Sequence, residues 1–309
     1  MFIGVGLGLD RLGGRSGSLG TLDFTAALTG ATVVSTPAGY ARTSTGTFTV
    51  FTANAGRRTD LGLAVEASQT NTVFNSLDMS NVYWTKTACT VSAATGPSGV
   101  SNAWNIIEDG TTNTHDVSTT ASVSHTAAGI IYVWAKAGTR GWATIQLNNA
   151  GNASNVYFDL SGAGAVGSNN VLAGSSTITS GNILLLGNGW YRCGIVPVST
   201  FGTAQLYMGF ASGNGGRSYT GVNTNIAGIY WNPQCRATNI PNDSAIDTTA
   251  TSATRTAENI TVVAPASTTK ALFKFDDDTT QLVTGLSAGT YTLPTTLNRP
   301  QIKTITWQA

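Results

Sequence analysis

Ile130–Lys136, with the sequence IIYVWAK, is the stretch that decides the fold class of this chain. It is a short apolar run rich in β-branched and aromatic residues, which favour strands over helices. A run of this length and composition is typical of a strand that is buried on both faces. The stretch therefore predicts a central strand of a β-rich domain.

The sequence on either side of this stretch continues the β pattern. Thr43–Ala53 alternates polar and apolar residues, as a half-buried strand does. Ile183–Leu186 and Trp190–Val196 flank Gly187–Asn188–Gly189, and Asn-Gly between apolar strands is a strong hairpin signal because both residues tolerate positive φ. Helical periodicity is almost absent. Regular strands separated by Gly, Asn, Ser and Thr turns predict an all-β sandwich or jelly roll.

Composition suggests three regions along the chain. Residues 1–20 form a Gly-rich leader, residues 21–263 carry the sandwich pattern, and residues 264–309 are expected to form a small C-terminal β unit. Asn242–Glu258 is rich in Thr, Ser and Ala, so we expect a linker or a strap that lies on the domain. The expected closing strand of the sandwich and the expected strands of the C-terminal unit are Ile260–Val263, Ala271–Phe275, Gln281–Thr284, Thr290–Leu293 and Gln301–Trp307.

The leader contains an apolar octapeptide, Phe2–Leu9. It is too short to span a bilayer, which takes about 20 residues, and no basic region precedes it as in a signal peptide. It is either a disordered end or a peptide that docks into a neighbouring subunit or a larger particle. The candidate docking residues are Phe2, Ile3, Val5, Leu7 and Leu9.

Charge and cysteine content exclude several classes of protein. Only 10% of the 309 residues are charged and the formal net charge is +1, so no basic surface for nucleic acid is expected. The surface must be covered largely by neutral polar residues, as in subunits that associate with their own copies. The three cysteines, Cys89, Cys193 and Cys235, include no CxxC pair, so we expect neither a disulfide framework nor a zinc site.

Several short motifs resemble catalytic or ligand sites but lack the required context. Gly162–Gly167 (GAGAVG) and Gly285–Gly289 (GLSAG) are followed by no helical pattern, so we interpret both as turns rather than a dinucleotide site and a nucleophile elbow. His115 and His125 lack a metal-ligand spacing. Asp276–Asp278 could gather oxygens around a hard cation, although solvated turn carboxylates are the simpler interpretation. We therefore expect no metal and no cofactor.

A glycoside hydrolase remains an alternative, because two carboxylates about 5–10 Å apart would suffice for its chemistry. The candidate carboxylates are Glu66, Glu108, Asp109, Asp116 and Asp159. Aromatic side chains give a different lead, since their faces stack on sugar rings. Trp134, Trp190 and Trp231 lie on apolar strands and are expected in the core, whereas Trp142 and Arg140 flank a turn and are expected at the surface.

Five blocks in a fixed order carry a resemblance to a known family: LGLAVEASQTN (Leu61–Asn71), SLDMSNVYW (Ser76–Trp84), YVWAKAGTRGW (Tyr132–Trp142), LGNGWYRC (Leu186–Cys193) and AGIYWNPQCRATNIPND (Ala227–Asp243). Over residues 57–260 the chain resembles a β-sandwich module that recurs in tailed-phage head fibres and tail appendages. The family usually reads GAQLE where this chain has NPQCR (Asn232–Arg236), so Arg236 replaces an acidic residue.

The resemblance implies a concanavalin-like jelly roll on a virion that is assembled in the host cytoplasm. It implies a homotrimer without catalytic activity that contacts other virion proteins through the leader and host-surface glycans through the sandwich. The candidate glycan-binding residues are Trp142, Arg140, His115 and Tyr157. A purely architectural subunit and a polysaccharide depolymerase remain the alternatives.

Overall fold

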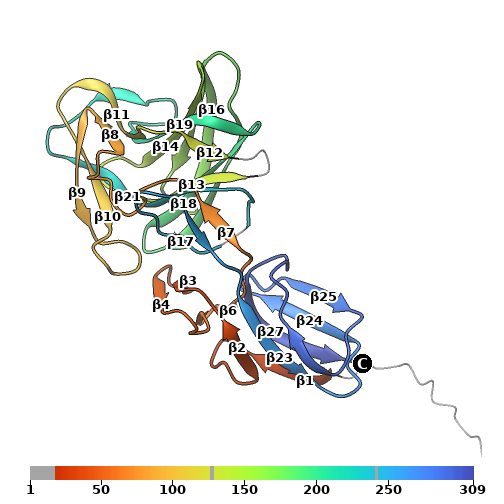
Figure 1. Ribbon diagram of the computed structural model, residues 1–309. Helices are drawn as coiled ribbons and strands as arrows, with labels where there is room; N and C mark the ends of the chain where they lie inside the picture. The colour runs from red at the N-terminus through yellow and green to blue at the C-terminus, as the bar shows by residue number, and fades with distance from the viewer. Residues whose placement is uncertain (1–17, 126–128, 241–242) are drawn as a thin grey trace, which may run out of the picture.

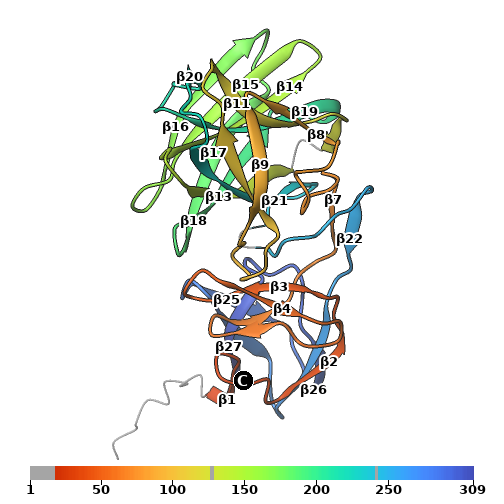
Figure 2. The same ribbon diagram turned by 90° about the vertical axis from the view of Figure 1, so that its left-hand side faces the viewer.

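The computed structural model describes residues 18–125, 129–240 and 243–309, and within them the protein is all-β (Figure 1). The described residues fold into two lobes, a larger sandwich and a smaller second lobe, which both ribbon views separate clearly (Figure 2). No described helix could cross a membrane. The candidate docking residues Phe2, Ile3, Val5, Leu7 and Leu9 lie outside the described part of the chain.

The larger lobe consists of two antiparallel sheets packed face to face. The six-stranded sheet has the order β17-β18-β13-β21-β10-β9, and the eight-stranded sheet has the order β16-β15-β14-β19-β11-β20 with β12 and β8 beside it. The first sheet contains β9 (Cys89–Ala94), β10 (Ala103–Glu108), β13 (Ile130–Ala137), β17 (Ile178–Gly187), β18 (Trp190–Pro197) and β21 (Ile226–Arg236). The second contains β8 (Trp84–Thr87), β11 (Thr112–Thr119), β12 (Val123–His125), β14 (Trp142–Asn149), β15 (Asn152–Asp159), β16 (Ala165–Ala173), β19 (Phe201–Ala211) and β20 (Ser218–Thr220).

The apolar stretch that predicted a doubly buried strand is β13, and that prediction is confirmed. Ile131, Val133 and Ala135 face the core between the two sheets. Ile130, Tyr132 and Trp134 alternate with them and belong to a separate apolar cluster on the opposite face of the sheet. Successive side chains of a strand point to opposite faces, so β13 needs cover on both sides.

The second cover comes from a hairpin near the N-terminus, β3 (Gly39–Arg42) and β4 (Phe48–Phe51). The ring of Phe48 lies 5.8 Å from that of Trp134, edge to face, and Tyr40 meets Trp231 in the same way at 5.3 Å. The predicted continuous strand over Thr43–Ala53 is therefore wrong, because residues 43–47 form the turn before β4.

The predicted turns agree with the structure. Asn188 (φ 51°) and Gly189 (φ 75°) connect β17 to β18, as the Asn-Gly signal indicated. Asp276–Thr279 connect β24 (Lys270–Phe275) to β25 (Thr280–Thr284). The two glycine motifs, at residues 162–167 and 285–289, lie at the β15–β16 and β25–β26 connections and precede no helix.

The second lobe is built from both ends of the described chain. Its six-stranded sheet has the order β25-β24-β27-β6-β5, with β1 paired to β27, and its three-stranded sheet has the order β2-β23-β26. A separate apolar core that includes Phe24, Leu63, Phe273 and Trp307 lies between them. The remaining strands are β1 (Ser18–Asp23), β2 (Ala31–Ser35), β5 (Arg58–Thr59), β6 (Gly62–Ala64), β23 (Asn259–Ala264), β26 (Gly289–Thr292) and β27 (Gln301–Gln308).

This pairing differs from the predicted boundaries at residues 21, 263 and 264. The strands expected in an independent C-terminal unit pair with N-terminal strands that had been assigned to the sandwich. Ile260–Val263, expected to close the sandwich, lies in β23 between β2 and β26 of the second lobe. The reason is physical: strands of four to eight residues cannot bury a core alone, and the N-terminal segment supplies their missing partners.

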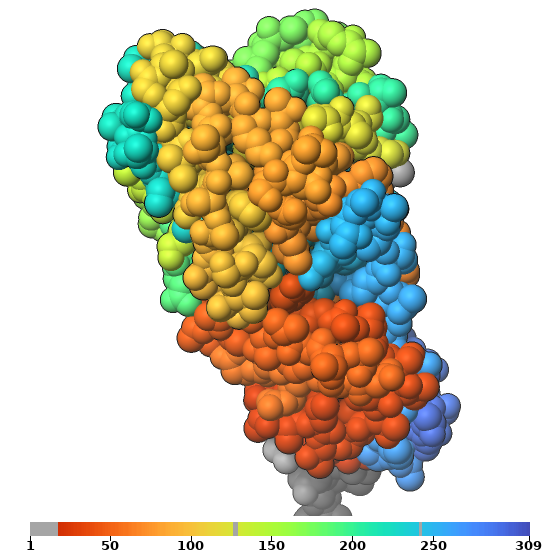
Figure 3. Space-filling model, turned by 60° about the vertical axis from the view of Figure 1, so that its left-hand side comes forward, coloured from red at the N-terminus to blue at the C-terminus, as the bar shows by residue number. Residues whose placement is uncertain are grey.

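A strap from Asp243 to Glu258 links the two lobes. Its residues Asp243–Ile246 are buried, and its short strand β22 (Ala253–Arg255) pairs with β7 (Gln69–Asn71). On the face in Figure 3 the blue residues of this strap run along the sandwich toward the second lobe, which abuts the sandwich directly. Of the two expectations for this segment, linker or strap, the structure supports the strap.

Candidate binding face

The outer face of the eight-stranded sheet carries polar side chains in place of a second apolar cover. Along β14, Ile145 and Leu147 point into the core, so Thr144 and Gln146 point outward. Cross-strand pairing places Asn155 and Tyr207 on either side of Gln146. The next row pairs Tyr157 with Thr144, Thr144 with Gly209, and Gly209 with Asp116. We call these two rows, with Trp142 and Arg217, the polar outer face.

Several polar atoms on this face have no hydrogen-bond partner among the described residues although they are buried. They are both side-chain amide atoms of Asn155, Oε1 of Gln146, Oδ1 of Asp116 and Nε of Arg217. Asn155 is 0% exposed. An unpaired buried polar group costs about 1–3 kcal/mol, so such groups usually meet a water or a ligand. Because these atoms have almost no exposed area, a ligand hydroxyl can pair with them only after neighbouring side chains move. The partly exposed side chains of the face are Trp142, Tyr207 and Arg217.

An ion pair organises one end of the polar outer face. Arg217 donates to Oδ2 of Asp116, and its guanidinium lies 6.0 Å from the centre of the Tyr207 ring. Burial raises the pKa of Asp116 even though Arg217 acts in the opposite direction. The other carboxylate oxygen, Oδ1, is buried and has no hydrogen-bond partner among the described residues.

Two of the four predicted glycan-binding residues lie on this face. Trp142 is partly exposed at the start of β14, and one side of its indole is covered by the backbone of Gly167, where a Cβ would come within 2.8 Å of the ring. Tyr157 is only 2% exposed, so its ring supports the face from below and offers little surface to a ligand. Tyr207 is partly exposed and takes the aromatic position expected of Tyr157.

The other two predicted residues belong to a different cluster. His115 pairs with Phe210, which faces the core, and it is 0% exposed; its neighbour Asp116 is the residue that faces outward. The prediction for His115 is wrong in this respect, because a shift of one residue along a strand reverses the face. The His115 ring stacks on the Tyr219 ring, with the two ring centres 4.5 Å apart. The Arg140 guanidinium lies 4.3 Å from the centre of the same tyrosine ring.

Glu108 fixes this second cluster. Arg140 donates to both of its carboxylate oxygens at 2.5 and 2.9 Å, and the Tyr219 hydroxyl and the Val222 amide donate at 2.9 Å each. Burial would raise the pKa of Glu108, but these donors outweigh it and the pKa is lowered. Glu108 therefore anchors the segment after β20 through the Val222 amide, and Nε and Nη2 of Arg140 are engaged by Glu108.

The candidate carboxylates are each engaged by groups of the protein. Glu108 and Asp116 hold Arg140 and Arg217, Glu66 holds Arg57 and Arg255, and Asp109 and Asp159 accept hydrogen bonds from Thr111 and Ser161. Asp276–Asp278 form ion pairs with Arg299, Lys274 and Lys303. No cluster of three or more His, Cys, Asp or Glu side chains suited to a metal occurs in the described residues.

The three cysteines lie in strands β9, β18 and β21. Cys193 and Cys235 are buried and Cys89 is half-buried, all as free thiols. Burial raises the pKa of Cys89 to about 12 and that of Cys235 to about 11, so neither is an activated nucleophile.

Comparison with known proteins adds no family assignment. No protein-family model matches the chain, and no curated protein shows significant similarity to it. The functional argument therefore rests on the residues and their geometry.

Proposed function

We propose that this protein is a non-catalytic structural protein of a phage particle that presents a carbohydrate-binding β-sandwich. The observation that carries the binding role is the polar outer face, where the partly exposed Trp142, Tyr207 and Arg217 lie beside buried amide and carboxylate groups that have no hydrogen-bond partner among the described residues. Sugars present hydroxyl groups that pair with such donors and acceptors, and apolar ring faces that stack on aromatic side chains. The virion location rests on the sequence resemblance, which also supports a head-fibre or tail-appendage role and a homotrimer.

Binding can be tested with the Asn155→Ala, Gln146→Ala double variant on an array of bacterial surface glycans. We expect the intact chain to bind a subset of the array, and the double variant to lose about tenfold or more in affinity, since two hydrogen-bonding side chains are removed. The matched control is Asn105→Ala, an amide truncation on the six-stranded sheet, which should bind normally. If the double variant bound glycans as well as the Asn105→Ala control does, the polar outer face would be rejected as the site.

Location can be tested with antibody labelling of intact particles under the electron microscope. Label at the tail tip would support a role in host adsorption, and label over the capsid would support a head fibre or decoration protein. The absence of label would refute the virion assignment. Label without any glycan binding would favour the architectural alternative, which the low charge content also suits.

A depolymerase is the alternative that the geometry favours least, because the candidate carboxylates are engaged in ion pairs or turn contacts. Release of reducing ends from host capsule would revive it.

A further inference from the structure

A second polar site lies between the two lobes, away from the polar outer face. It is a cleft of about 580 Å³ lined by both lobes. The sandwich contributes Asn182–Leu185 of β17, Arg192 of β18 and Asn239, and the second lobe contributes Arg42, Asp276, Asp277 and Arg299. A volume of this size falls in the range of small-molecule sites.

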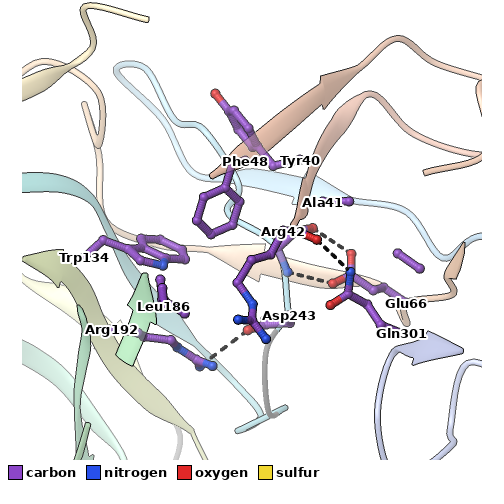
Figure 4. Close-up of a pocket in the computed structure, with 12 residues that line it drawn as sticks. Tyr40, Ala41, Arg42, Phe48, Glu66, Trp134, Leu186, Arg192, Asp243 and Gln301 are labelled. Carbon is purple, nitrogen blue, oxygen red and sulfur yellow. Dashed lines mark hydrogen bonds and ion pairs between the residues drawn. The ribbon is translucent and has the colours of Figure 1, made fainter. Parts of the chain in front are cut away.

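Two arginines of the cleft lining carry hydrogen-bond donors without partners. Arg42 and Arg192 also line a narrow cavity of about 10 Å³ together with Trp134 and Gln301 (Figure 4). Nε of Arg42, Nε of Arg192 and Nε1 of Trp134 are buried and have no hydrogen-bond partner among the described residues, and the one unpaired acceptor there is Oε1 of Gln301. Trp134 and Gln301 line the narrow cavity and are not part of the cleft lining. The unpaired Nε donors of Arg42 and Arg192 belong to both, and they favour a group that accepts hydrogen bonds.

Of the arginines that line the cleft, Arg192 has the weakest structural ion pair. Its side chain is 6% exposed, and it stacks 3.8 Å above the Tyr132 ring. Its Nη2 approaches Oδ1 of Asp243 at 3.4 Å, but Asp243 is already the partner of Arg236 at 2.9 Å. Two guanidinium groups thus share one carboxylate, which leaves one positive charge in excess.

The second lobe adds charge that is more evenly balanced. Arg299 donates to both oxygens of Asp276 at 2.6 and 2.8 Å, and Arg42 reaches the same carboxylate at 3.4 Å. In Figure 4 the Arg42 and Arg192 side chains extend toward the same region from opposite lobes. The cleft lining therefore contains three arginines against two aspartates, and its two unpaired Nε donors come one from each lobe.

We propose that this cleft binds the carboxylate of an acidic sugar. A planar carboxylate matches the donor geometry of guanidinium groups, and a single negative charge matches the excess of one arginine. The side chain of Leu184, which pairs with Arg192 across strands and shares its face, offers an apolar wall for one face of the sugar ring, and the Asn182 and Asn239 amides can pair with its hydroxyl groups. Because Arg42 and Arg192 lie on different lobes, the bound ligand would also hold the lobes together.

The test compares sodium D-glucuronate with D-glucose, which has the same ring without the carboxylate. Binding of each to the full chain is measured by calorimetry, and the thermal unfolding midpoint is recorded at saturating sugar. We expect glucuronate to bind and raise the midpoint and glucose to do neither. Equal behaviour of the two sugars would overturn the proposal, as would binding of inorganic phosphate without glucuronate, which would indicate an oxyanion site that admits no sugar ring.

Variants locate the site. Arg42→Gln should weaken glucuronate binding about tenfold, since a charged hydrogen-bond donor is lost, and Lys274→Gln removes the same charge from an exposed position of the same lobe as the control. Asn239 is exposed and lines the cleft, so its variants should fold. Asn239→Asp should weaken binding and Asn239→Lys should not. Unchanged binding in both Arg42→Gln and Asn239→Asp would overturn the proposal.

The two sites can fail separately. The Asn155→Ala, Gln146→Ala variant should retain full glucuronate binding in the cleft, because its residues lie on the opposite sheet. Loss of glucuronate binding in that variant would place the acidic sugar on the polar outer face and refute the cleft.

Discussion

The two lobes contain the same kind of structure but are assembled in opposite ways. The sandwich strands come from one continuous stretch, β8 to β21, whereas the second lobe joins residues 18–64 to residues 259–308. In the second lobe the central strand β27 pairs with β1 and β6, which lie more than 200 residues earlier in the chain. The sandwich can therefore form once its own stretch is complete, whereas the second lobe must wait for both ends.

The lobes and the junction between them are stabilised by different interactions. Each has its own apolar core, but their junction depends on buried charge. Arg57 lies at its centre, 0% exposed, and donates to Glu258 at 2.5 Å, to the Tyr40 carbonyl oxygen at 2.7 Å and to Glu66. Arg255 lies 2.9 Å from Glu66, and the Ser244 amide donates to the same carboxylate at 2.6 Å. A single substitution in the junction should therefore produce the largest difference in stability between the two lobes.

Arg57→Ala should produce the largest effect. It leaves Glu66 and Glu258 close together and buried with less compensating charge, and breaking a buried pair in this way costs about 3–5 kcal/mol. We expect the free energy of unfolding in urea to fall by that amount and the second lobe to unfold before the sandwich. Tyrosine and tryptophan fluorescence can follow this, because the sandwich contains most of the tryptophans. A single transition with an unchanged midpoint would show that the junction is not stabilising.

Glu258 makes the same junction sensitive to pH. Burial raises the pKa of Glu258 to about 7, with Glu66 adding to the effect and Arg57 opposing it, while the unfolded chain has the ordinary value of 4.5. The folded state therefore holds a proton that the unfolded state loses. The stabilisation from this proton is complete below about pH 4.5 and is lost as the pH rises through about 7.

Glu258→Gln tests this sign. The amide stays neutral at every pH, so the stability of the variant relative to the intact chain should rise between pH 4.5 and 7.5, by on the order of 3 kcal/mol. Comparing the two proteins cancels His125, whose pKa is lowered by burial and whose contribution runs the other way. A constant difference between the two pH profiles would exclude a raised pKa for Glu258.

The sequence predicts the parts of the structure that depend on local composition, and it does not predict those that depend on pairing between distant strands. Strand β13 and the Asn188–Gly189 turn depend on local composition, and both were predicted correctly. The second lobe depends on pairings such as Leu22 with Ile305, which no local pattern encodes, so the boundary at residue 264 was wrong.

The binding face shows the same division between local pattern and register. The alternation in Thr144–Leu147 and Asn155–Phe158 separates inward from outward residues, so Gln146 and Asn155 could have been found from it. Which face is covered depends on neighbouring strands. His115, a candidate that the resemblance implied, is buried and faces the core, and Arg217, which reaches the polar outer face from a loop, carried no signal.

Gly46→Ala should have an intermediate effect on the contact between the lobes. Gly46 has φ +81° in the β3–β4 turn, and a Cβ there would lie 2.3 Å from the Leu186 carbonyl oxygen of the sandwich. The left-handed backbone alone costs a non-glycine residue about 1–3 kcal/mol, and the clash adds to it. Gly99→Ala is the matched control, because Gly99 has a similar φ of +78° with no heavy atom within 4 Å of the added Cβ. A larger loss of urea stability in Gly46→Ala than in Gly99→Ala measures the contact, and equal losses would mean that the turn does not press on the sandwich.

Asp278→Asn should have the smallest effect, and it sharpens the contrast with Arg57. Asp278 forms ion pairs with Lys274 and Lys303 at 2.9 and 3.0 Å, and the first of these distances equals that of Arg255 to Glu66 in the junction. Hydrogen bonds from these two lysines lower the pKa of Asp278, but its side chain is 64% exposed. Water and salt screen such a pair, and ordering two long side chains offsets the attraction. We expect the thermal unfolding midpoint of Asp278→Asn to match that of the intact chain at 0.15 M salt. A decrease comparable to that of Arg57→Ala would show that burial is not what gives the junction its strength, because the two sites would then differ in exposure but not in effect.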